Sequence, residues 1–151
     1  MRARIQMLEY EYREAWKTLN QAYRLGGQSF QPWYLMGVLN RFYKEYDRAR
    51  TLLRKAKGLA RHDYQTRWVL QALMKVADDT GDAAAEERLH KEEIELFPRR
   101  AHAYGNYGAF LLEQDRYEDA IVQLEKALSI HRYPMALEQL RKARRLAEER
   151  E

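Results

Sequence analysis

Residues 117–130 read YEDAIVQLEKALSI, and they contain the pattern Tyr-x-x-Ala-x-x-x-Leu-x-x-Ala-x-x-(Leu/Ile). The same pattern starts at Tyr12, at Tyr46 and at Tyr117, so the copies lie 34 and 71 residues apart. A fixed period of this size is typical of stacked helical repeats. The apolar residues are separated by three and four positions, which places them on one side of a helix. The pattern therefore predicts three amphipathic helices of one kind.

A second stripe, with a small residue at its centre, precedes two of these copies. Its members are Trp33, Met36, Gly37 and Asn40 before one copy, and Tyr104, Tyr107, Gly108 and Leu111 before the other. A small residue lets two helices approach closely, because large side chains on one helix need a shallow groove opposite. We therefore expect hairpins in which a front helix ends near Tyr43 or Gln114 and a back helix begins beside Tyr46 or Tyr117.

These residues resemble the tetratricopeptide repeat (TPR) family. The positions that carry the resemblance are Trp33, Gly37, Tyr46, Ala49, Leu53 and Ala56, and again Tyr104, Gly108, Tyr117, Ala120, Leu124 and Ala127. The resemblance implies an all-α fold, a right-handed α-solenoid of about 3.5 TPR hairpins with a C-terminal capping helix. Its expected parts form a single TPR domain over 1–151: a half repeat at 1–27, a repeat at 30–63, a degenerate repeat at 64–100, a repeat at 101–134 and a capping helix at 135–151.

Two of these parts depart from the family pattern. The residues before Tyr12 are expected to be the second half of a front helix, either abbreviated or cut from a longer array. In the degenerate repeat the front glycine is missing, and Ala85 and Leu89 are expected on the packing side of the back helix, in a frame that the sequence leaves open by one residue. Glu92 or Glu93 replaces the second alanine.

Composition limits the possible functions. Hydrophobic residues make up 46% of the chain and charged residues 33%, which favours a folded helical protein over a disordered one. Cysteine is absent, so disulfide scaffolds and thiolate sites are excluded. The first residues lack an apolar signal core, and no apolar run approaches the length of a membrane span. We expect a cytoplasmic protein, or a periplasmic one if a signal segment was removed.

The residue types that form catalytic and metal sites in other proteins are scattered along this sequence. The four histidines, His62, His90, His102 and His131, are far apart, and none lies one helical turn from another. Neither serine lies in a nucleophile-elbow sequence. The sequence therefore predicts no catalytic residue, no metal site and no cofactor, and the expected protein is not an enzyme.

The TPR resemblance implies that the front helices line a concave groove that binds a peptide or a partner helix. Carried over position by position, the groove residues are Gln31, Tyr34, Leu35, Val38, Arg41, Phe42, Gln71, His102, Asn106 and Ala109, with Arg67 and Met74, or Trp68 and Lys75, beside Gln71. Asn106 matches a position that often hydrogen-bonds a ligand backbone in TPR grooves. The partners of a carboxylate clamp are absent around it, and the apolar residues of the first full repeat favour an apolar ligand. The expected function is that of a protein-protein interaction scaffold.

Three other functions stay open. Nucleic acid could bind through the basic stretch 41–67, which holds nine basic and three acidic residues, although the net charge of only +4 makes this partner unlikely. Residues 104–120 also resemble one repeat of the TPR lipoproteins that assist type IV pilus assembly. Finally, the N-terminal half repeat could mediate self-association through apolar residues left uncovered there, namely Ile5, Met7, Leu8 and Trp16.

Overall fold

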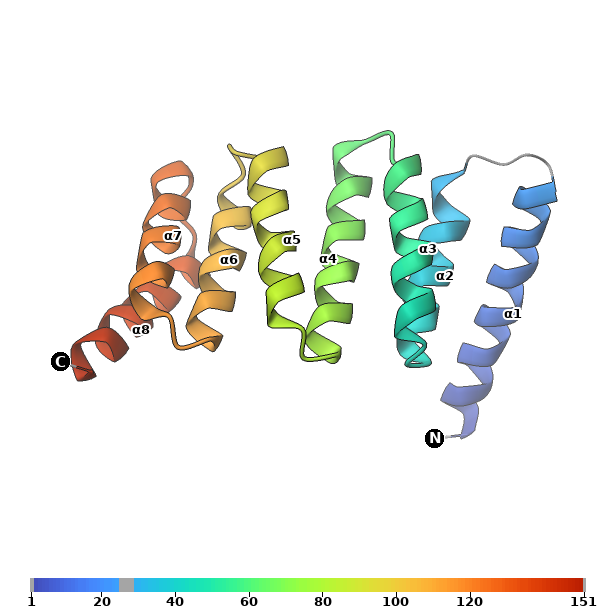
Figure 1. Ribbon diagram of the computed structural model, residues 1–151, viewed down its shortest axis with the longest axis horizontal. Coiled ribbons are helices and arrows are strands. Elements are labelled where there is room, and N and C mark those ends of the chain that lie inside the picture. Colours follow the sequence, from blue (N-terminus) through green and yellow to red (C-terminus); the bar gives the residue numbers. More distant parts are fainter. Residues whose placement is uncertain (1, 25–28, 151) are drawn as a thin grey trace. The chain divides into compact units, whose positions relative to one another are not determined.

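The computed structural model describes residues 2–24 and 29–150, and every regular element in these two ranges is an α-helix (Figure 1). The helices are α1 (Arg2–Arg24), α2 (Phe30–Phe42), α3 (Tyr46–Leu59), α4 (Asp63–Asp79), α5 (Ala83–Leu96), α6 (Ala101–Glu113), α7 (Tyr117–Ile130) and α8 (Pro134–Glu149). The chain divides into two compact units, Met1–Asp82 and Ala83–Glu151. In the described part of the chain, no helix combines the length and the apolar character needed to cross a membrane.

In the first unit, α2 and α3 form the expected hairpin. Gly37 lies directly against Leu53, and a Cβ at Gly37 would be 2.6 Å from Leu53 Cγ. Helix α1 packs against α2, and Leu19, Met36 and Leu39 form a buried cluster between these helices. The close glycine contact explains why the front-helix stripe has a small residue at its centre.

The hairpin turns each contain one residue with positive φ. Lys44 in the α2–α3 turn has φ 61°, and Asp115 in the α6–α7 turn has φ 57°. The amide of Glu45 donates a hydrogen bond of 2.9 Å to the carbonyl of Asn40, and the second turn has the equivalent bond. This six-to-one bond belongs to the Schellman helix ending, in which glycine usually occupies the left-handed position. Here a lysine and an aspartate occupy it.

Helix α1 differs from the expected half repeat. It runs without a break from Arg2 to Arg24, so no separate piece of a front helix precedes Tyr12. The physical reason is local: residues 6–14 contain no glycine, proline or left-handed turn residue that would end a helix. The predicted boundary at residue 27 and the side chains of Ile5 and Leu8 lie outside the part of the chain that is described.

The register of α5 also differs from the prediction. A third left-handed turn residue, Gly81 with φ 68°, lies 37 residues after Lys44 and 34 before Asp115. The same offsets place four α5 residues at the family positions Tyr, Ala, Leu and Ala, namely Ala83, Glu86, His90 and Glu93.

Burial agrees with this register. His90 and Glu93 are the buried residues of α5, whereas Ala85 and Leu89 are only partly buried. Of the frames that the sequence left open within one residue, the structure therefore has the one in which the packing positions follow Ala85 and Leu89 by one residue, with polar side chains at the buried positions. Glu93, not Glu92, replaces the second alanine, and Met74 stands in place of the front glycine.

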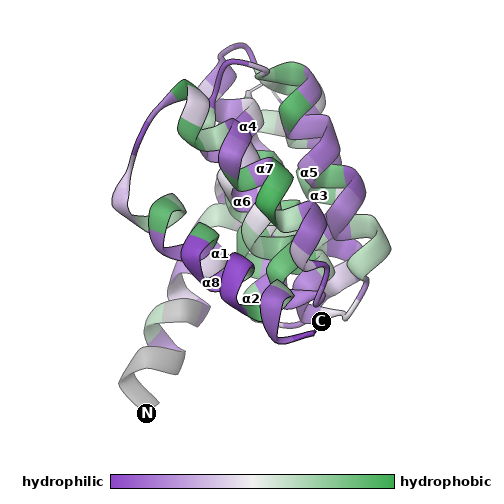
Figure 2. Cartoon of the chain, turned by 90° about the vertical axis from the view of Figure 1, so that its left-hand side faces the viewer, coloured by the Kyte–Doolittle hydropathy of each residue, from purple (hydrophilic) through white to green (hydrophobic). Residues whose placement is uncertain are grey.

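The second unit contains α5 to α8. Gly108 packs against Leu124, with Leu124 Cγ 2.7 Å from the position of a Cβ, so the α6–α7 hairpin repeats the contact seen between α2 and α3. Helix α8 packs against α7 and buries Ala136, Leu140 and Ala143 in the core of this unit. Both hydrophobic and hydrophilic residues lie along α8 in Figure 2, as expected for a helix with one buried side.

Candidate partner-binding surface

A groove of about 750 Å³ lies between α1 and α2 in the first unit. Four of the predicted groove residues line it: Gln31, Leu35, Val38 and Phe42. They are spaced by four, three and four positions, so they form one stripe along α2. The other lining residues are Tyr10, Glu11, Glu14, Ala15, Thr18, Ser29, Pro32 and Leu39.

The groove has a mainly apolar lining that remains accessible. Leu35 is 42% exposed, Phe42 59% and Tyr10 65%. Large apolar side chains that remain exposed around a hollow are characteristic of binding surfaces. The stripe of α2 can therefore contact a partner without rearrangement of the helix.

The α1 side of this groove was missed in the sequence. Tyr10, Glu14 and Thr18 follow one another at steps of four along α1 and line the groove. The resemblance divided this region into the end of a front helix before Tyr12 and a back helix after it, and it assigned none of these residues to the groove. The signal that could have found these residues is the i, i+4 spacing itself, on the side of the helix away from Leu19.

The electrostatic character of the groove comes from α1. Glu11 and Glu14 are the charged residues among its described lining. Glu14 pairs with Lys17 at 2.7 Å, but the Lys17 side chain is 72% exposed. An exposed pair of this kind contributes little and exchanges readily with solvent or with another cation. One edge of the apolar groove is therefore acidic.

Tyr34 lies outside this groove, among aromatic rings that connect α2 with α4. Its ring stacks on Phe30 with centroids 5.4 Å apart and contacts Trp68 at 5.9 Å. Trp68 in turn meets Tyr64 edge to face at 5.0 Å. Burial raises the pKa of the Tyr34 phenol above its usual value. Tyr34 thus contributes to the contact between two front helices.

Arg41 also points toward α4. Its Nε donates to Asp79 Oδ2 at 2.6 Å, and its Nη2 donates to Asp79 Oδ1 at 3.2 Å. On α4, Gln71 is half-buried, Met74 is buried and Trp68 is 47% exposed. Of the two sets predicted beside Gln71, the register of the Gly81 turn favours Trp68 and Lys75.

The remaining predicted groove residues belong to α6 in the second unit. His102 stacks on Tyr133, with ring centroids 4.5 Å apart and an interplanar angle of 9°. The Tyr133 hydroxyl also lies against Gly105, at the place where a Cβ would project. Asn106 is exposed and Ala109 is partly buried. Tyr133 therefore covers part of the α6 surface that was predicted to bind a ligand.

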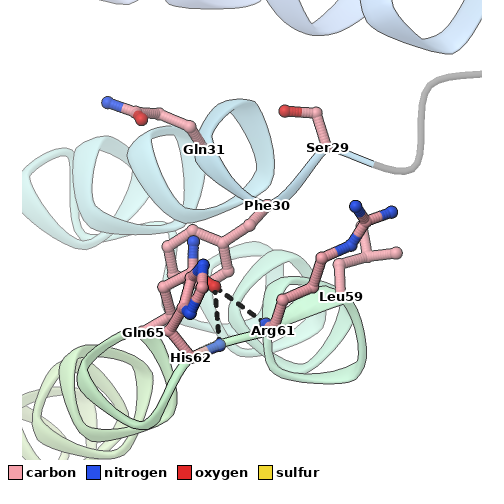
Figure 3. Close-up of a pocket in the computed structure, with 7 residues that line it drawn as sticks. All are labelled: Ser29, Phe30, Gln31, Leu59, Arg61, His62 and Gln65. Atoms are coloured by element: carbon pink, nitrogen blue, oxygen red, sulfur yellow. Dashed lines mark hydrogen bonds between the residues drawn. The ribbon is translucent and has the colours of Figure 1, made fainter.

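A second hollow of about 420 Å³ lies beside the loop between α3 and α4 (Figure 3). Gln65 Oε1 accepts hydrogen bonds from the backbone amides of Arg61 at 2.8 Å and His62 at 3.2 Å. These bonds fix the start of α4. Arg61 and His62 face the hollow with Ser29 and Gln31 on its other side (Figure 3).

Part of the basic stretch 41–67 takes part in intramolecular contacts. Arg41 pairs with Asp79, Arg50 pairs with Asp47 at 2.8 Å, and the Lys55 ammonium lies 5.7 Å from the centre of the Trp33 ring. These contacts indicate that part of the charge in this stretch is paired within the first unit, as is usual for charges on solvated helix faces.

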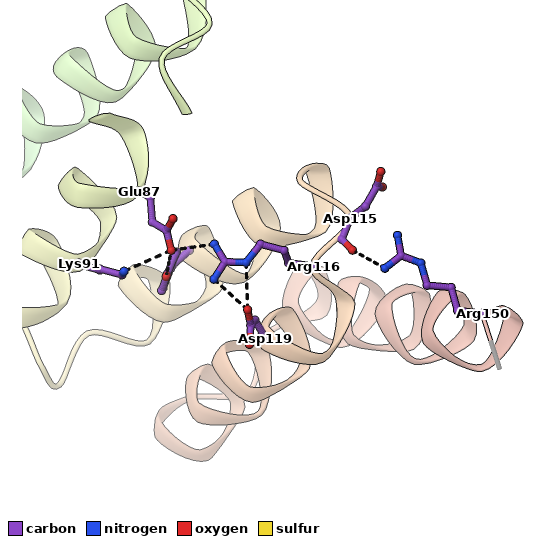
Figure 4. Close-up of polar contacts among 7 residues, drawn as sticks. Glu87, Lys91, Asp115, Arg116, Asp119 and Arg150 are labelled. Atoms are coloured by element: carbon purple, nitrogen blue, oxygen red, sulfur yellow. Dashed lines mark hydrogen bonds and ion pairs between the residues drawn. The ribbon is translucent and has the colours of Figure 1, made fainter. Parts of the chain in front are cut away.

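In the second unit, Glu87 is the centre of a polar cluster (Figure 4). It accepts a hydrogen bond of 2.6 Å from the Tyr107 hydroxyl and one of 2.9 Å from Arg116 Nη1, and it pairs with Lys91 at 3.3 Å. The Tyr107 hydrogen bond, assisted by Arg116 and Lys91, lowers the pKa of Glu87 to about 2 against the opposing effect of burial. Burial and Glu87 together raise the pKa of Tyr107 to about 12.

His90 lies close to this cluster and is 5% exposed. Its ring contacts Tyr107 at 5.8 Å and Phe110 at 5.2 Å between centroids. Burial lowers the pKa of His90 to about 4, although the negative charge of Glu87 acts in the opposite direction. His90 is therefore neutral at pH 7. In the sequence, His90 was considered only as a possible metal ligand, and Glu87 was given no role.

In residues 2–24 and 29–150, no three His, Cys, Asp or Glu side chains come together as metal ligands could. The cluster around Glu87 links α5, α6 and α7 and is used in ion pairs and hydrogen bonds between these helices.

No family model and no curated protein matches the sequence. Solved structures do match. The MamA RS-1 ArsTM double mutant aligns over 95% of this chain and 89% of its own, with 17% identity and a TM-score of 0.59. YrrB, described as a TPR protein with an unusual peptide-binding site, aligns over 95% of this chain and 80% of its own, with 15% identity and a TM-score of 0.57. MamA 41-end from Desulfovibrio magneticus RS-1 aligns over 93% and 97%, with 15% identity and a TM-score of 0.54.

At identities of 15–17%, these similarities concern the fold. They agree with the all-helical hairpin fold described above. The chain has a TPR-like fold, as its repeated motif predicted.

Proposed function

We propose that this protein is a non-catalytic interaction module that binds a segment of a partner protein in the groove between α1 and α2. The observation that carries the proposal is the apolar stripe of α2, in which Leu35 and Phe42 line the groove and remain 42% and 59% exposed. A protein gains affinity by burying such side chains in a partner, and aromatic residues dominate many binding sites.

The fold supports this proposal. YrrB, which has a similar fold, is described as a TPR protein with a peptide-binding site. In the present chain, the groove is formed by α2, which is the front helix of its hairpin, and α1 closes one side. The positions that repeat along the sequence, such as Leu53 and Ala56, are fully buried and unavailable to a partner. Binding specificity then belongs to front-helix positions, where the repeats differ.

The test compares groove variants with a matched surface variant. Partners are captured from native lysate with the unmodified protein, and the captured protein is then titrated against Leu35→Ala, Phe42→Ala and Val122→Ala. Val122 is 61% exposed on α7 and lies outside the groove, so Val122→Ala is the control. Loss of a buried Phe side chain is expected to weaken binding about tenfold or more.

Two results would count against the groove. One is equal affinity for Phe42→Ala and the unmodified protein, when circular dichroism shows the same helix content in both. The other is a loss of affinity in Val122→Ala as large as in the groove variants, since this would indicate a general effect of apolar truncation.

Self-association is a second candidate function, favoured by one observation on α1. Met7 is 64% exposed and Trp16 48%, in addition to Tyr10 in the groove. A second copy of the chain could cover these side chains. Light scattering across a wide concentration range tests this directly, and a mass that remains monomeric at every concentration contradicts it.

A further inference from the structure

The groove between α1 and α2 has a shape that suits a short helix. Its lining extends from residue 10 to residue 18 on α1 and from residue 29 to residue 42 on α2. At 1.5 Å per residue these stretches are about 12 and 20 Å long, which corresponds to about two to four turns of a bound helix. The two helices run in opposite directions (Figure 1), and side chains of both line the trough between them.

The chemistry of the trough favours a helical occupant over an extended one. The backbone groups of α1 and α2 are already bonded within their own helices. The Thr18 hydroxyl is bonded to the Glu14 carbonyl at 2.9 Å, so the remaining neutral polar groups of the described lining are the Tyr10 hydroxyl and the side chains of Ser29 and Gln31. An extended segment would lose water from its amides and carbonyls without regaining partners, whereas a helix satisfies its own backbone.

The charges of the groove lining determine which kind of partner helix fits the groove. Glu11 and Glu14 stand on the α1 wall, and the nearest cation on α2, Arg41, is held by two bonds to Asp79. The whole chain carries a net charge of +4, so this acidic wall opposes the overall sign. Interactions between exposed charges act only within about 8 Å at physiological salt, and a bound segment therefore responds to the local carboxylates.

We infer that the partner segment is an amphipathic helix of two to four turns whose apolar side faces Leu35, Val38 and Phe42 and whose flanking lysines or arginines face Glu11 and Glu14. This inference rests on the proposed function, since it names the chemistry of the partner at the same groove. Apolar residues at i, i+3 and i+7 of the partner match the spacing of the apolar residues in the α2 stripe.

Model peptides test this inference without knowledge of the natural partner. The first is a 14-residue peptide of leucine and lysine with leucines at i, i+3, i+4 and i+7, labelled for fluorescence anisotropy. The second replaces every lysine by glutamate. The third keeps the composition of the first apart from a central proline, which breaks the helix. The unmodified protein is expected to bind the first peptide more tightly than either of the others.

Variants of the protein test whether the lysine peptide binds at the acidic wall of the groove. In the double variant Glu11→Gln, Glu14→Gln, affinity for the lysine peptide is expected to fall about two- to thirty-fold, the range for two exposed charge pairs. The double variant Glu138→Gln, Glu148→Gln makes the same change of charge at exposed positions of α8 and is expected to bind as the unmodified protein does. The preference for lysine should decrease as salt is raised.

The outcomes separate the two proposals. If Phe42→Ala abolishes binding but the Glu11, Glu14 variant and the glutamate peptide bind normally, the groove stands and the basic partner is wrong. If the proline peptide binds as well as the helical one, the helical occupant is wrong. If Phe42→Ala and the Glu11, Glu14 variant both leave the affinity for the lysine peptide unchanged, the groove itself is not the binding site and both proposals fall.

Discussion

Arg41 and Asp79 make a two-point contact between α2 and α4, with distances of 2.6 and 3.2 Å. The guanidinium and carboxylate planes meet in the geometry that only arginine provides. Their side chains are 24% and 26% exposed, so the pair is partly protected from solvent. The pair links two front helices of the first unit through a residue that was predicted to lie in the groove.

We predict that Arg41→Lys lowers the stability of the first unit and leaves partner binding intact. Lysine retains the charge but loses one of the two bonds, at a cost of at most about 1 kcal/mol for a partly exposed pair. Urea unfolding measures the stability, and peptide titration measures the binding. Arg54→Lys, at an exposed position of α3, is the control. Reduced affinity at unchanged stability would return Arg41 to the binding surface.

The glycine contacts give a second prediction. Gly108→Leu should lower the melting temperature, because the first added carbon already lies 2.7 Å from Leu124 Cγ. Overpacking of this kind costs about 1–3 kcal/mol. Gly37→Ala should act in the same direction at the equivalent contact with Leu53.

Gly58 provides the matched control. It lies in α3, and nothing lies within 4 Å of where its Cβ would be. Gly58→Ala should raise stability by about 0.5–1 kcal/mol, because alanine loses less backbone entropy in a helix. If the Gly108→Leu variant has a melting temperature equal to or higher than that of the unmodified protein, the proposed hairpin contact is contradicted.

Much of the fold could be predicted from the sequence, because packing positions that recur are constrained by one geometry. Gly37 and Gly108 each have to admit a leucine from the back helix, so the same residue types return at the same spacing. The turns were placed correctly as well, even though Lys44 and Asp115 are not the residues that usually mark a left-handed helix ending.

The register of α5, in the middle of the chain, could not be predicted to the exact residue. His90 and Glu93 are polar, and an apolar pattern cannot identify polar residues that are buried. Half of the binding groove was missed for a related reason. The groove needs α1 as an unbroken helix beside α2, and exposed positions such as Tyr10 and Glu14 are under no packing constraint that would make them repeat.

The hydrogen bond from Tyr107 to Glu87 gives a third prediction. Tyr107→Phe retains the ring against His90 and Phe110 but removes the 2.6 Å bond. We expect the free energy of unfolding to fall by about 1–2 kcal/mol at pH 7. The fall stays below the largest values for hydrogen bonds to charged groups, because Arg116 and Lys91 still pair with Glu87.

The same bond makes the effect depend on pH. The pKa of Glu87 is about 2 in the folded protein, below its ordinary value of 4.5, so its stabilisation is complete above pH 4.5 and is lost as the pH falls toward 2. The difference between Tyr107→Phe and the unmodified protein, measured by denaturant unfolding, should therefore shrink over this interval. A difference that stays constant from pH 7 to pH 2.5 would show that the bond does not favour the ionised carboxylate.

His90 gives the fourth prediction, in a higher range of pH. Burial lowers its pKa from 6.5 to about 4, so between these values the unfolded chain binds a proton that the folded chain does not. Stability must then decrease as the pH falls from 6.5 to 4, by at most about 3 kcal/mol.

His90→Leu should remove this loss. Leucine is the residue at the equivalent positions 53 and 124, it is apolar, and it cannot be protonated in the ring stack formed with Tyr107 and Phe110. Denaturant unfolding at pH 7.5 and at pH 4.5 measures the effect: the variant should gain stability relative to the unmodified protein as the pH is lowered. Glu86 lies 3.8 Å from His90 Nε2 and would favour the protonated ring. If the two pH profiles run parallel, this carboxylate outweighs burial, and His90 does not account for acid sensitivity in the second unit.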